Sequence, residues 1–263
     1  MKRQKLDKIK GKVAVITGGS SGIGKKISLE LAKKGVKIGV CSLSEEELEE
    51  LADELNSIYS KDNYLLKKAD IRSGDEMQSF YYSLKDKFED INFLIANAGV
   101  TDLKHHSIKD LEYKIWQKII DINLNGTFNT VKTFLEEIAA TKGNIIFITS
   151  LLGQKNYGKK NDAPYCASKF GIEGFKEVLA EEMKVHNVNV NSLFPAAKVN
   201  TKFFSYLSEV EKKELKSPEI IIDPLLFLLS LSPGKLTGQA INASKWHNDL
   251  DYKTNLLKKG KDD

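Results

Sequence analysis

The alternation of short apolar runs with longer amphipathic stretches is the feature that most constrains the fold. VAVIT at 13–17 is typical of a strand, and the stretch at 23–34 has the periodicity of a helix. Further strands are expected at 36–41, 64–70, 92–99, 144–150, 188–194 and 238–242, and further helices at 44–55, 74–88, 110–138, 164–185 and 218–230. Strands that are apolar throughout belong to parallel sheets buried on both faces. The sequence therefore predicts an α/β fold, a doubly wound parallel sheet with helices on both faces.

Length and charge limit the organisation of the chain and its partners. The 263 residues suffice for one large domain, and no repeat or Pro/Gly/Ser-rich linker divides them. Residues 1–12 hold six Lys or Arg and one Asp, so much of the positive charge lies at the ends and nucleic-acid binding is not expected. We expect a basic tail at 1–10, one domain at 11–244 and a C-terminal tail at 245–263.

Cysteine content and hydropathy predict the compartment. Cys41 and Cys166 are too few for a disulfide framework, and no Cys or His spacing suggests a metal site. The chain has no run of about 20 apolar residues, so no integral membrane segment is expected. Its basic start is not followed by the apolar core of a secretory signal. We expect a cytoplasmic protein without a bound metal.

The segment TGGSSGIG at 17–24 lies between the first predicted strand and the first predicted helix. A glycine turn there points backbone N–H groups and a helix N-terminus at a ligand, which favours phosphate. A P-loop would need a hydroxyl at position 26, where the chain has Lys26. A nucleophile elbow would need Asp and His partners that no later strand end clearly supplies. A dinucleotide-binding loop is the third possibility, and the glycines alone do not decide.

Tyr165 and Lys169 form the most informative pair. Four residues are about one helical turn, so the phenol and the ammonium share a helix face, and a nearby cation lowers a tyrosine pKa from about 10. This predicts a proton donor or acceptor. The same spacing occurs at 64–68 and 81–85, but only Tyr165 follows a strand that ends in a hydroxyl, Ser150.

Taken together, these motifs resemble the short-chain dehydrogenase/reductase family, from about residue 11 to about residue 243. The matching elements are TGGSSGIG at 17–24, Asp70-Ile71, Asn97-Ala98-Gly99, Asn123, Ser150, YCASK at 165–169, Pro195 to Thr201 and LTGQ at 236–239. The resemblance implies a single Rossmann-type domain that transfers hydride between a nicotinamide cofactor and a small-molecule carbonyl or alcohol. It also implies a homodimer or homotetramer paired through the helices at 110–138 and 164–185.

The resemblance assigns a role to each matching residue. Tyr165 would be the general acid in reduction or the base in oxidation, and Lys169 would bind the nicotinamide ribose and lower the pKa of Tyr165. Ser150 would bind the substrate oxygen, and Asn123 would hold a water that links Lys169 to solvent. The cofactor-binding set would be Gly18, Ser20, Ser21, Gly22, Ile23, Gly24, Ser42, Asp70, Ile71, Asn97, Ala98, Gly99, Tyr165, Lys169, Pro195 and Thr201.

The end of the second predicted strand departs from the family pattern. NAD-dependent members usually carry an acid there and NADP-dependent members an Arg nearby, whereas this chain reads Cys41-Ser42-Leu43-Ser44. No carboxylate repels a 2′-phosphate here, Ser42 and Ser44 can donate hydrogen bonds to it, and Lys25 and Lys26 after the glycine loop add positive charge. We therefore expect NADP(H) to be favoured over NAD(H). A cofactor-binding module without turnover is the alternative from another functional class.

The segment after the sixth predicted strand also departs from the pattern. Pro195 to Thr201 is one residue longer than the family motif and lacks its glycine. The next residues, 202–217, include Phe203, Phe204 and Tyr206. These aromatic side chains are expected either to line a substrate pocket or to pack on the core.

Overall fold

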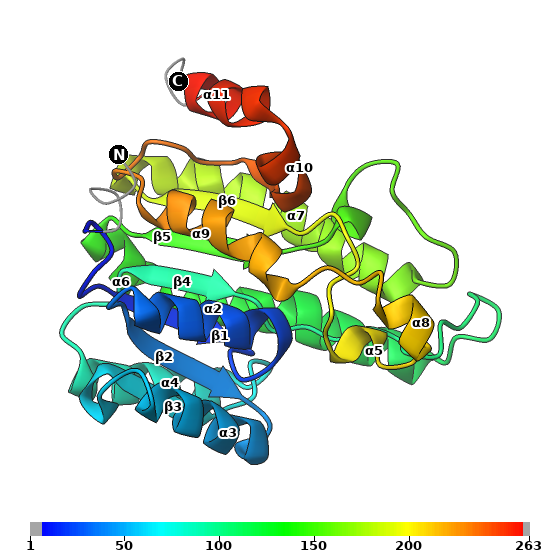
Figure 1. The fold of residues 1–263 in the computed structure, drawn as a ribbon, viewed down its shortest axis with the longest axis horizontal. Helices are drawn as coiled ribbons and strands as arrows, with labels where there is room; N and C mark the ends of the chain where they lie inside the picture. The colour runs from blue at the N-terminus through cyan, green and yellow to red at the C-terminus, as the bar shows by residue number, and fades with distance from the viewer. Residues whose placement is uncertain (1–6, 260–263) are drawn as a thin grey trace.

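The computed structural model describes residues 7–259, and one seven-stranded sheet is its framework. The strand order is β3-β2-β1-β4-β5-β6-β7, and every neighbouring pair is parallel (Figure 1). The strands are β1 Val13–Thr17, β2 Lys37–Ser42, β3 Tyr64–Lys68, β4 Phe93–Ala96, β5 Asn144–Ile148, β6 Asn189–Phe194 and β7 Ala240–Asn242. The predicted doubly wound parallel sheet is confirmed.

Helices cover both faces of the sheet, and in Figure 1 α2 and α9 lie in front of the strands. The helices are α2 Gly22–Lys33, α3 Glu45–Asn56, α4 Gly74–Lys87, α5 Tyr113–Ile120, α6 Gly126–Thr141, α7 Ala163–Met183, α8 Glu209–Lys212, α9 Ile222–Leu229, α10 Ala243–Asn248 and α11 Leu250–Lys259. Successive strand residues point to opposite faces, so Ile16 joins the core under α2, α3 and α9, and Val15 joins the core under α4, α6 and α7. Both faces are therefore buried, which explains the continuous apolar runs.

The helices that follow β2 and β3 begin at serine caps. The Ser44 hydroxyl accepts a hydrogen bond from the Glu47 amide at 3.2 Å, and Ser73 accepts from the Glu76 amide at the same distance. Acidic residues occupy both first turns, where the helix dipole favours negative charge. Each cap fixes where the chain leaves the carboxyl edge of the sheet.

A π-helical turn at Asp121–Asn125 interrupts the predicted helix at 110–138. The predicted long helix is present from Tyr113 to Thr141, with this wider turn between α5 and α6. The helix resumes at Gly126, where a side chain would place its Cβ 2.6 Å from Ile71. The turn thus brings α6 close to the segment that follows β3.

The two predicted tails differ from the structure. Residues 243–259 form α10 and α11, in which Trp246 and Leu256 are buried and the Tyr252 hydroxyl accepts from the Asn242 amide at 2.9 Å. A solvated tail at 245–263 is therefore wrong for most of its length, since these side chains complete the core next to α9. Ile9 is fully buried as well, and residues 1–6 and 260–263 lie outside the described part of the chain.

Candidate active site

A cavity of about 530 Å³ runs along the carboxyl edge of the sheet. Segments after six of the strands line it, and such an edge is where open α/β sheets bind ligands. The predicted site residues in its wall are Gly18, Ser21, Gly22, Ile23, Ser42, Asp70, Ile71, Asn97, Ala98, Gly99, Ser150, Tyr165, Lys169, Pro195 and Thr201. Three others, Ser20, Gly24 and Asn123, lie behind the wall. The fold therefore brings together residues that are far apart in the sequence.

The glycine loop lies below the N-terminus of α2. Gly18 and Gly22 have φ of +61° and +53°, the left-handed region that glycine adopts without strain. Ser21 precedes α2 without capping it through its side chain, so the first amides of α2 face the cavity. A side chain at Gly24 would place its Cβ 2.1 Å from the Gly18 carbonyl oxygen. Gly24 therefore allows the loop to fold back on the helix and does not itself reach the cavity.

Asn97 holds the glycine loop in place. Its side-chain amide donates to the carbonyl oxygens of Thr17 and Gly18, each at 3.0 Å, and its backbone amide donates to the Thr17 hydroxyl at 3.1 Å. These bonds tie the end of β4 to the end of β1. The side chain is already engaged with the loop, so its role in this structure is to position the cavity wall.

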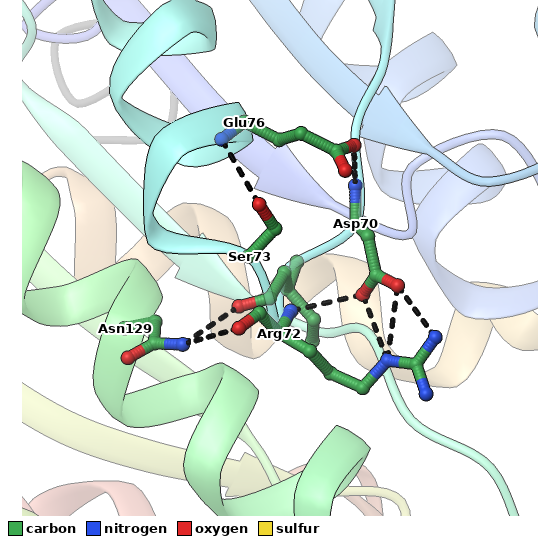
Figure 2. Close-up of polar contacts among 6 residues, drawn as sticks. Asp70, Arg72, Ser73, Glu76 and Asn129 are labelled. Atoms are coloured by element: carbon green, nitrogen blue, oxygen red, sulfur yellow. Dashed lines mark hydrogen bonds and ion pairs between the residues drawn. The ribbon is translucent and has the colours of Figure 1, made fainter.

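The segment after β3 is held by a network around Asp70 (Figure 2). The Arg72 guanidinium donates to the Asp70 carboxylate at 2.6 to 3.1 Å and holds the pKa of that carboxyl below its usual range. The Asp70 amide donates to Glu76, and Asn129 from α6 donates to the carbonyls of Ile71 and Arg72. Asp70 is thus already ion-paired, and sequence reasoning had missed its arginine partner two residues later.

Tyr165 and Lys169 project from the first turns of α7, which has Pro164 near its start. The Lys169 ammonium nitrogen lies 5.7 Å from the centre of the Tyr165 ring and donates to the Ile148 carbonyl oxygen at 3.1 Å. Tyr165 also hydrogen-bonds Ser150, which follows β5. Hydroxyl, phenol and ammonium therefore share one corner of the cavity, as the helical spacing predicts.

The acidities in this corner are set mainly by burial. Burial raises the pKa of Tyr165 to about 12, although the hydrogen bond with Ser150 opposes the shift. Burial lowers the pKa of Lys169 to about 8, although the charge of Glu173 opposes that shift. The expected lowering of the Tyr165 pKa by Lys169 is therefore not found in this structure, because loss of hydration disfavours both charged forms.

Asn123 is fully buried in the π-helical turn. Its side-chain amide donates to the Val100 carbonyl and the Ser168 hydroxyl at 2.9 Å, and its carbonyl oxygen accepts from the Val100 amide at 2.8 Å. A Cβ on Gly99 would lie 3.2 Å from the Asn123 side-chain oxygen and 3.5 Å from the Lys169 nitrogen. Asn123 thus lies close behind Lys169 and joins the end of β4 to α7.

A carboxylate that sequence reasoning missed lies at the end of β2. The Ser20 hydroxyl donates to the Glu47 carboxylate at 2.9 Å and lies 2.7 Å from the Ser42 hydroxyl, from which it accepts, and Lys202 forms an ion pair with Glu47. Burial acts to raise the pKa of Glu47, but hydrogen bonds from Lys202 and Ser20 outweigh it and lower that pKa. The sequence feature that could have indicated Glu47 is its place three residues after the helix cap Ser44, because an acidic side chain at that position turns back toward the start of the helix.

Lys25 and Lys26 do not supply positive charge to the cavity. Lys25 forms an ion pair with Glu54 at 2.7 Å, and Lys26 pairs with Glu30 at 3.1 Å and with Glu219. Lys25 reaches a carboxylate on α3, and Lys26 reaches one carboxylate on α2 itself and one just before α9. Both ammonium groups are therefore neutralised outside the cavity wall. The expectation of extra cationic charge from these two residues was wrong.

The segment after β6 covers the cavity with aromatic side chains. Ala196 has φ of +52°, the left-handed conformation that suits the missing glycine of the family motif. Phe203 packs edge-on against Tyr165 with 6.2 Å between ring centres, and Phe203, Phe204 and Tyr206 all line the cavity. The alternative of a purely structural aromatic face is therefore not what the structure shows.

Two further properties concern residues 7–259 only. No group of His, Cys, Asp and Glu side chains there is arranged to hold a metal ion. None of the helices in that range combines the length and apolar character needed to cross a bilayer.

The sequence of the chain is similar to those of known proteins. The profile of the short chain dehydrogenase family matches residues 12–212. The chain is 29% identical over 245 residues to the 3-oxoacyl-(acyl-carrier-protein) reductase FabG of Thermotoga maritima, covering 89% of this chain and 96% of the relative. It is 28% identical over 257 residues to the NADPH-dependent aldehyde reductase 2, chloroplastic, of Arabidopsis thaliana, covering 89% and 93%.

Solved structures agree with this placement. A short-chain type dehydrogenase/reductase from Mycobacterium marinum has a TM-score of 0.82 and 25% identity, covering 91% of this chain and 96% of the other. A putative short chain dehydrogenase from Shigella flexneri complexed with NADP has the same TM-score and identity, covering 91% and 99%. The chain is therefore a member of the short-chain dehydrogenase family, and it is an oxidoreductase.

Proposed function

We propose that this enzyme interconverts a small-molecule carbonyl compound and a secondary alcohol with NADP(H), with Tyr165 as general acid and base. The observation that carries the proposal is the meeting of Ser150, Tyr165 and Lys169 in the cavity that also holds the glycine loop. The nicotinamide cofactor supplies the hydride when bound. The chain supplies the proton, the orientation of the substrate and the site for the cofactor.

Tyr165 is protonated at neutral pH, since burial raises its pKa to about 12, so it is ready to donate a proton to a carbonyl oxygen. Ser150, hydrogen-bonded to the phenol, is placed to donate to the same oxygen and to stabilise the charge that develops on it. With a pKa of about 8, Lys169 carries its charge at neutral pH and stabilises the phenolate left after proton donation. Asn123 is bonded to Val100 and Ser168 and lies close to Lys169 on the side of Gly99.

The wall of the cavity suits a dinucleotide along its whole length. The amides of α2 and the glycines at 18 and 22, which carry no side chains of their own, suit the pyrophosphate. Asp70 and Ile71 line the cavity after β3, and we assign them to the adenine. Thr201 lies beside Gly22, since a Cβ added to that glycine would be 3.1 Å from the Thr201 methyl group. The set also includes Ser21, Ile23, Ala98, Gly99 and Pro195 in the wall, with Ser20 and Gly24 behind it.

Three observations support NADP(H) over NAD(H). Ser42 lines the cavity at the end of β2, and Lys202 brings an ammonium group to the same side. Glu47, the carboxylate that would oppose a 2′-phosphate, is already ion-paired with Lys202. The Arabidopsis relative is NADPH-dependent, and the Shigella structure is complexed with NADP.

Cofactor consumption tests the function. Oxidation of NADPH, followed by its absorbance, should occur with at least one member of a panel of ketones and aldehydes. Tyr165→Phe should lower kcat by about 10²- to 10⁴-fold and leave NADPH binding intact. Tyr157→Phe is the matched control, because Tyr157 is an exposed loop residue outside the cavity. Full turnover by Tyr165→Phe would contradict the proposal, and NADPH binding without turnover on any carbonyl would favour a cofactor-binding module.

We further propose a homodimer or homotetramer in a reducing cytoplasm. Apolar side chains remain exposed on α6 and α7, with Phe128, Phe170 and Val178 at 49%, 41% and 58% exposed. Cys41 and Cys166 are both free thiols, which suits a reducing compartment. Light scattering should give at least twice the 29.5 kDa chain mass, and Val178→Glu should weaken the association. A monomeric wild-type protein would contradict the oligomer.

A further inference from the structure

One histidine in the cavity wall, which is paired with an aspartate, has no role in the chemistry described above. His105 belongs to the segment after β4, and its Nδ1 lies 2.7 Å from the Asp162 carboxylate. The other oxygen of Asp162 is 2.9 Å from the Lys159 ammonium, and Asp162 itself is only 2% exposed. Because the carboxylate can only accept a hydrogen bond, Nδ1 carries a proton, and in the matching neutral tautomer Nε2 is an acceptor.

The Nε2 atom is the unexplained group. It is shielded from solvent and has no hydrogen-bond partner among the described residues, although His105, Asp162 and Lys159 all line the cavity. Polar atoms shielded in this way nearly always have a partner, so a ligand group is the natural candidate. His105 also has φ of +50°, a conformation that costs a non-glycine residue free energy.

An aromatic wall connects this histidine to the catalytic corner. Tyr165 packs against Phe203, Phe204 packs against Tyr206 at 6.3 Å, and Tyr206 packs edge-on against His105 with 5.0 Å between ring centres. His105 and Tyr165 therefore both pack against aromatic side chains of the same segment, residues 203–206. A substrate whose carbonyl meets Tyr165 would extend along this surface toward Nε2.

The neighbouring histidine provides an internal comparison. His106 has the same arrangement, with its Nδ1 at 2.7 Å from Asp102, and its side chain is 24% exposed against 25% for His105. His106 does not line the cavity, and its ring is not left with a shielded, unpartnered nitrogen. The two pairs thus differ in that only His105 combines a place in the cavity wall with a shielded, unpartnered ring nitrogen.

We propose that His105 is a specificity-determining residue whose Nε2 accepts a hydrogen bond from a substrate hydroxyl remote from the reacting carbonyl. Asp162 and Lys159 balance each other's charge, so the pair favours a neutral hydroxyl over a carboxylate. The preferred substrates are then hydroxylated ketones or aldehydes, or the matching diols. This inference rests on the proposed carbonyl reduction and deepens it.

Matched substrates test the inference. The probes are 2-alkanones, each paired with analogues that carry one hydroxyl at carbon 4, 5, 6 or 7, and with one analogue that ends in a carboxylate. The wild type should favour one hydroxylated member over its plain ketone by about tenfold or more in kcat/KM, mainly through KM. His105→Phe keeps a ring but removes the acceptor, and it should abolish this preference while plain-ketone turnover stays within about threefold.

His106→Phe is the matched control and should keep the preference. Asp162→Asn, which weakens the hold on the ring, should reduce it, and the thermal midpoint with NADPH shows whether each variant is folded. A wild type without any hydroxyl preference, a preference that survives His105→Phe, or a preference for the carboxylate analogue would each overturn the role of His105. Turnover of no ketone by the wild type would overturn the reductase proposal and this inference together, whereas turnover without hydroxyl preference overturns only the latter.

Discussion

The two walls of the cavity are built differently. The strand-end wall, formed by the residues that follow β1 to β5, is fixed by the parallel sheet and by short bonds such as those of Asn97 to the glycine loop. The covering segment, residues 196–217, has a single turn of 3-10 helix at Lys202–Phe204, the four-residue α8 and one bridge between Val199 and Lys216. Its charged contact with the other wall is the Lys202–Glu47 ion pair.

This difference separates two tasks. A wall held by backbone pairing suits a cofactor that every reaction cycle needs in one position. A wall held by side-chain contacts adapts more easily to the shape of a substrate, and it carries the aromatic groups that reach from Tyr165 to His105. Variants that disturb each wall should therefore have different consequences, and the four below run from the largest effect to the smallest.

Gly24→Ala tests how rigid the strand-end wall is. The added Cβ would lie 2.1 Å from a backbone carbonyl, so the loop and α2 must separate. We expect the free energy of unfolding to fall by about 3 kcal/mol and NADPH affinity to drop with it. Urea denaturation measures the first and a fluorescence titration the second. Gly74→Ala is the control, because a Cβ there meets nothing within 4 Å. If Gly24→Ala left both the free energy of unfolding and the NADPH affinity unchanged, the strand-end wall would be no more rigid than the covering segment.

Lys169→Met tests whether the buried charge of Lys169 lowers the free energy of unfolding. The pKa of Lys169 falls from 10.5 to about 8 on folding, so burying its charge costs the folded state about 3 kcal/mol, which the variant would regain. The variant would also leave the Ile148 carbonyl without its hydrogen bond, which costs about 1 kcal/mol. At pH 7 both states hold the proton and the penalty is complete, so the variant should be about 2 kcal/mol more stable and nearly inactive.

The pH dependence provides the check on this second prediction. Between pH 8 and 10.5 the unfolded chain binds the proton and the folded chain does not, so wild-type stability should rise relative to the variant until the advantage is gone. Lys176→Met should instead lose stability at pH 7, because it removes the ammonium group that forms an ion pair with the buried Glu173 at 3.1 Å and leaves that carboxylate only its neutral hydrogen-bond donors. A Lys169→Met protein less stable than wild type at pH 7 would contradict the burial argument.

Glu47→Gln tests the contact that joins the two walls. Without the carboxylate, Lys202 is released and a 2′-phosphate meets no negative charge beside Ser20. The ratio of kcat/KM for NADPH to that for NADH should rise about tenfold, equal to about 1.4 kcal/mol. Lys202→Met should change the ratio in the opposite direction, and the exposed Glu49→Gln should leave it unchanged. A ratio unaffected by Glu47→Gln would remove this group from cofactor choice.

Ala196→Gly tests the start of the covering segment. Ala196 has φ of +52°, which glycine adopts without strain, so the variant should be about 0.5–1 kcal/mol more stable. Ala197, equally half-buried but without a positive φ, should lose stability when changed to Gly. Denaturation midpoints of the two variants decide, and equal changes would show that the backbone at 196 is not strained.

The contrast between the walls also explains what could be predicted from the sequence. Strands, the glycine loop and the Tyr165–Lys169 pair follow from local periodicity and spacing, which the chain displays within a few residues. The ion pair of Glu47 with Lys202 spans 155 positions, and that of His105 with Asp162 spans 57, so neither leaves a local pattern. The direction of the Tyr165 pKa shift could not be predicted either, since it depends on burial by distant segments.

The cavity has a consequence for how binding and folding are linked. Its lining extends from Gly18 to Tyr206, so no short proteolytic fragment contains both the phosphate-binding turn and the aromatic surface. Ligand can then recognise only the fully assembled chain, and a concentration of 100 times its Kd would add about 2.7 kcal/mol against unfolding. The rate of proteolysis with and without nucleotide therefore measures how far ligand binding stabilises the whole folded chain.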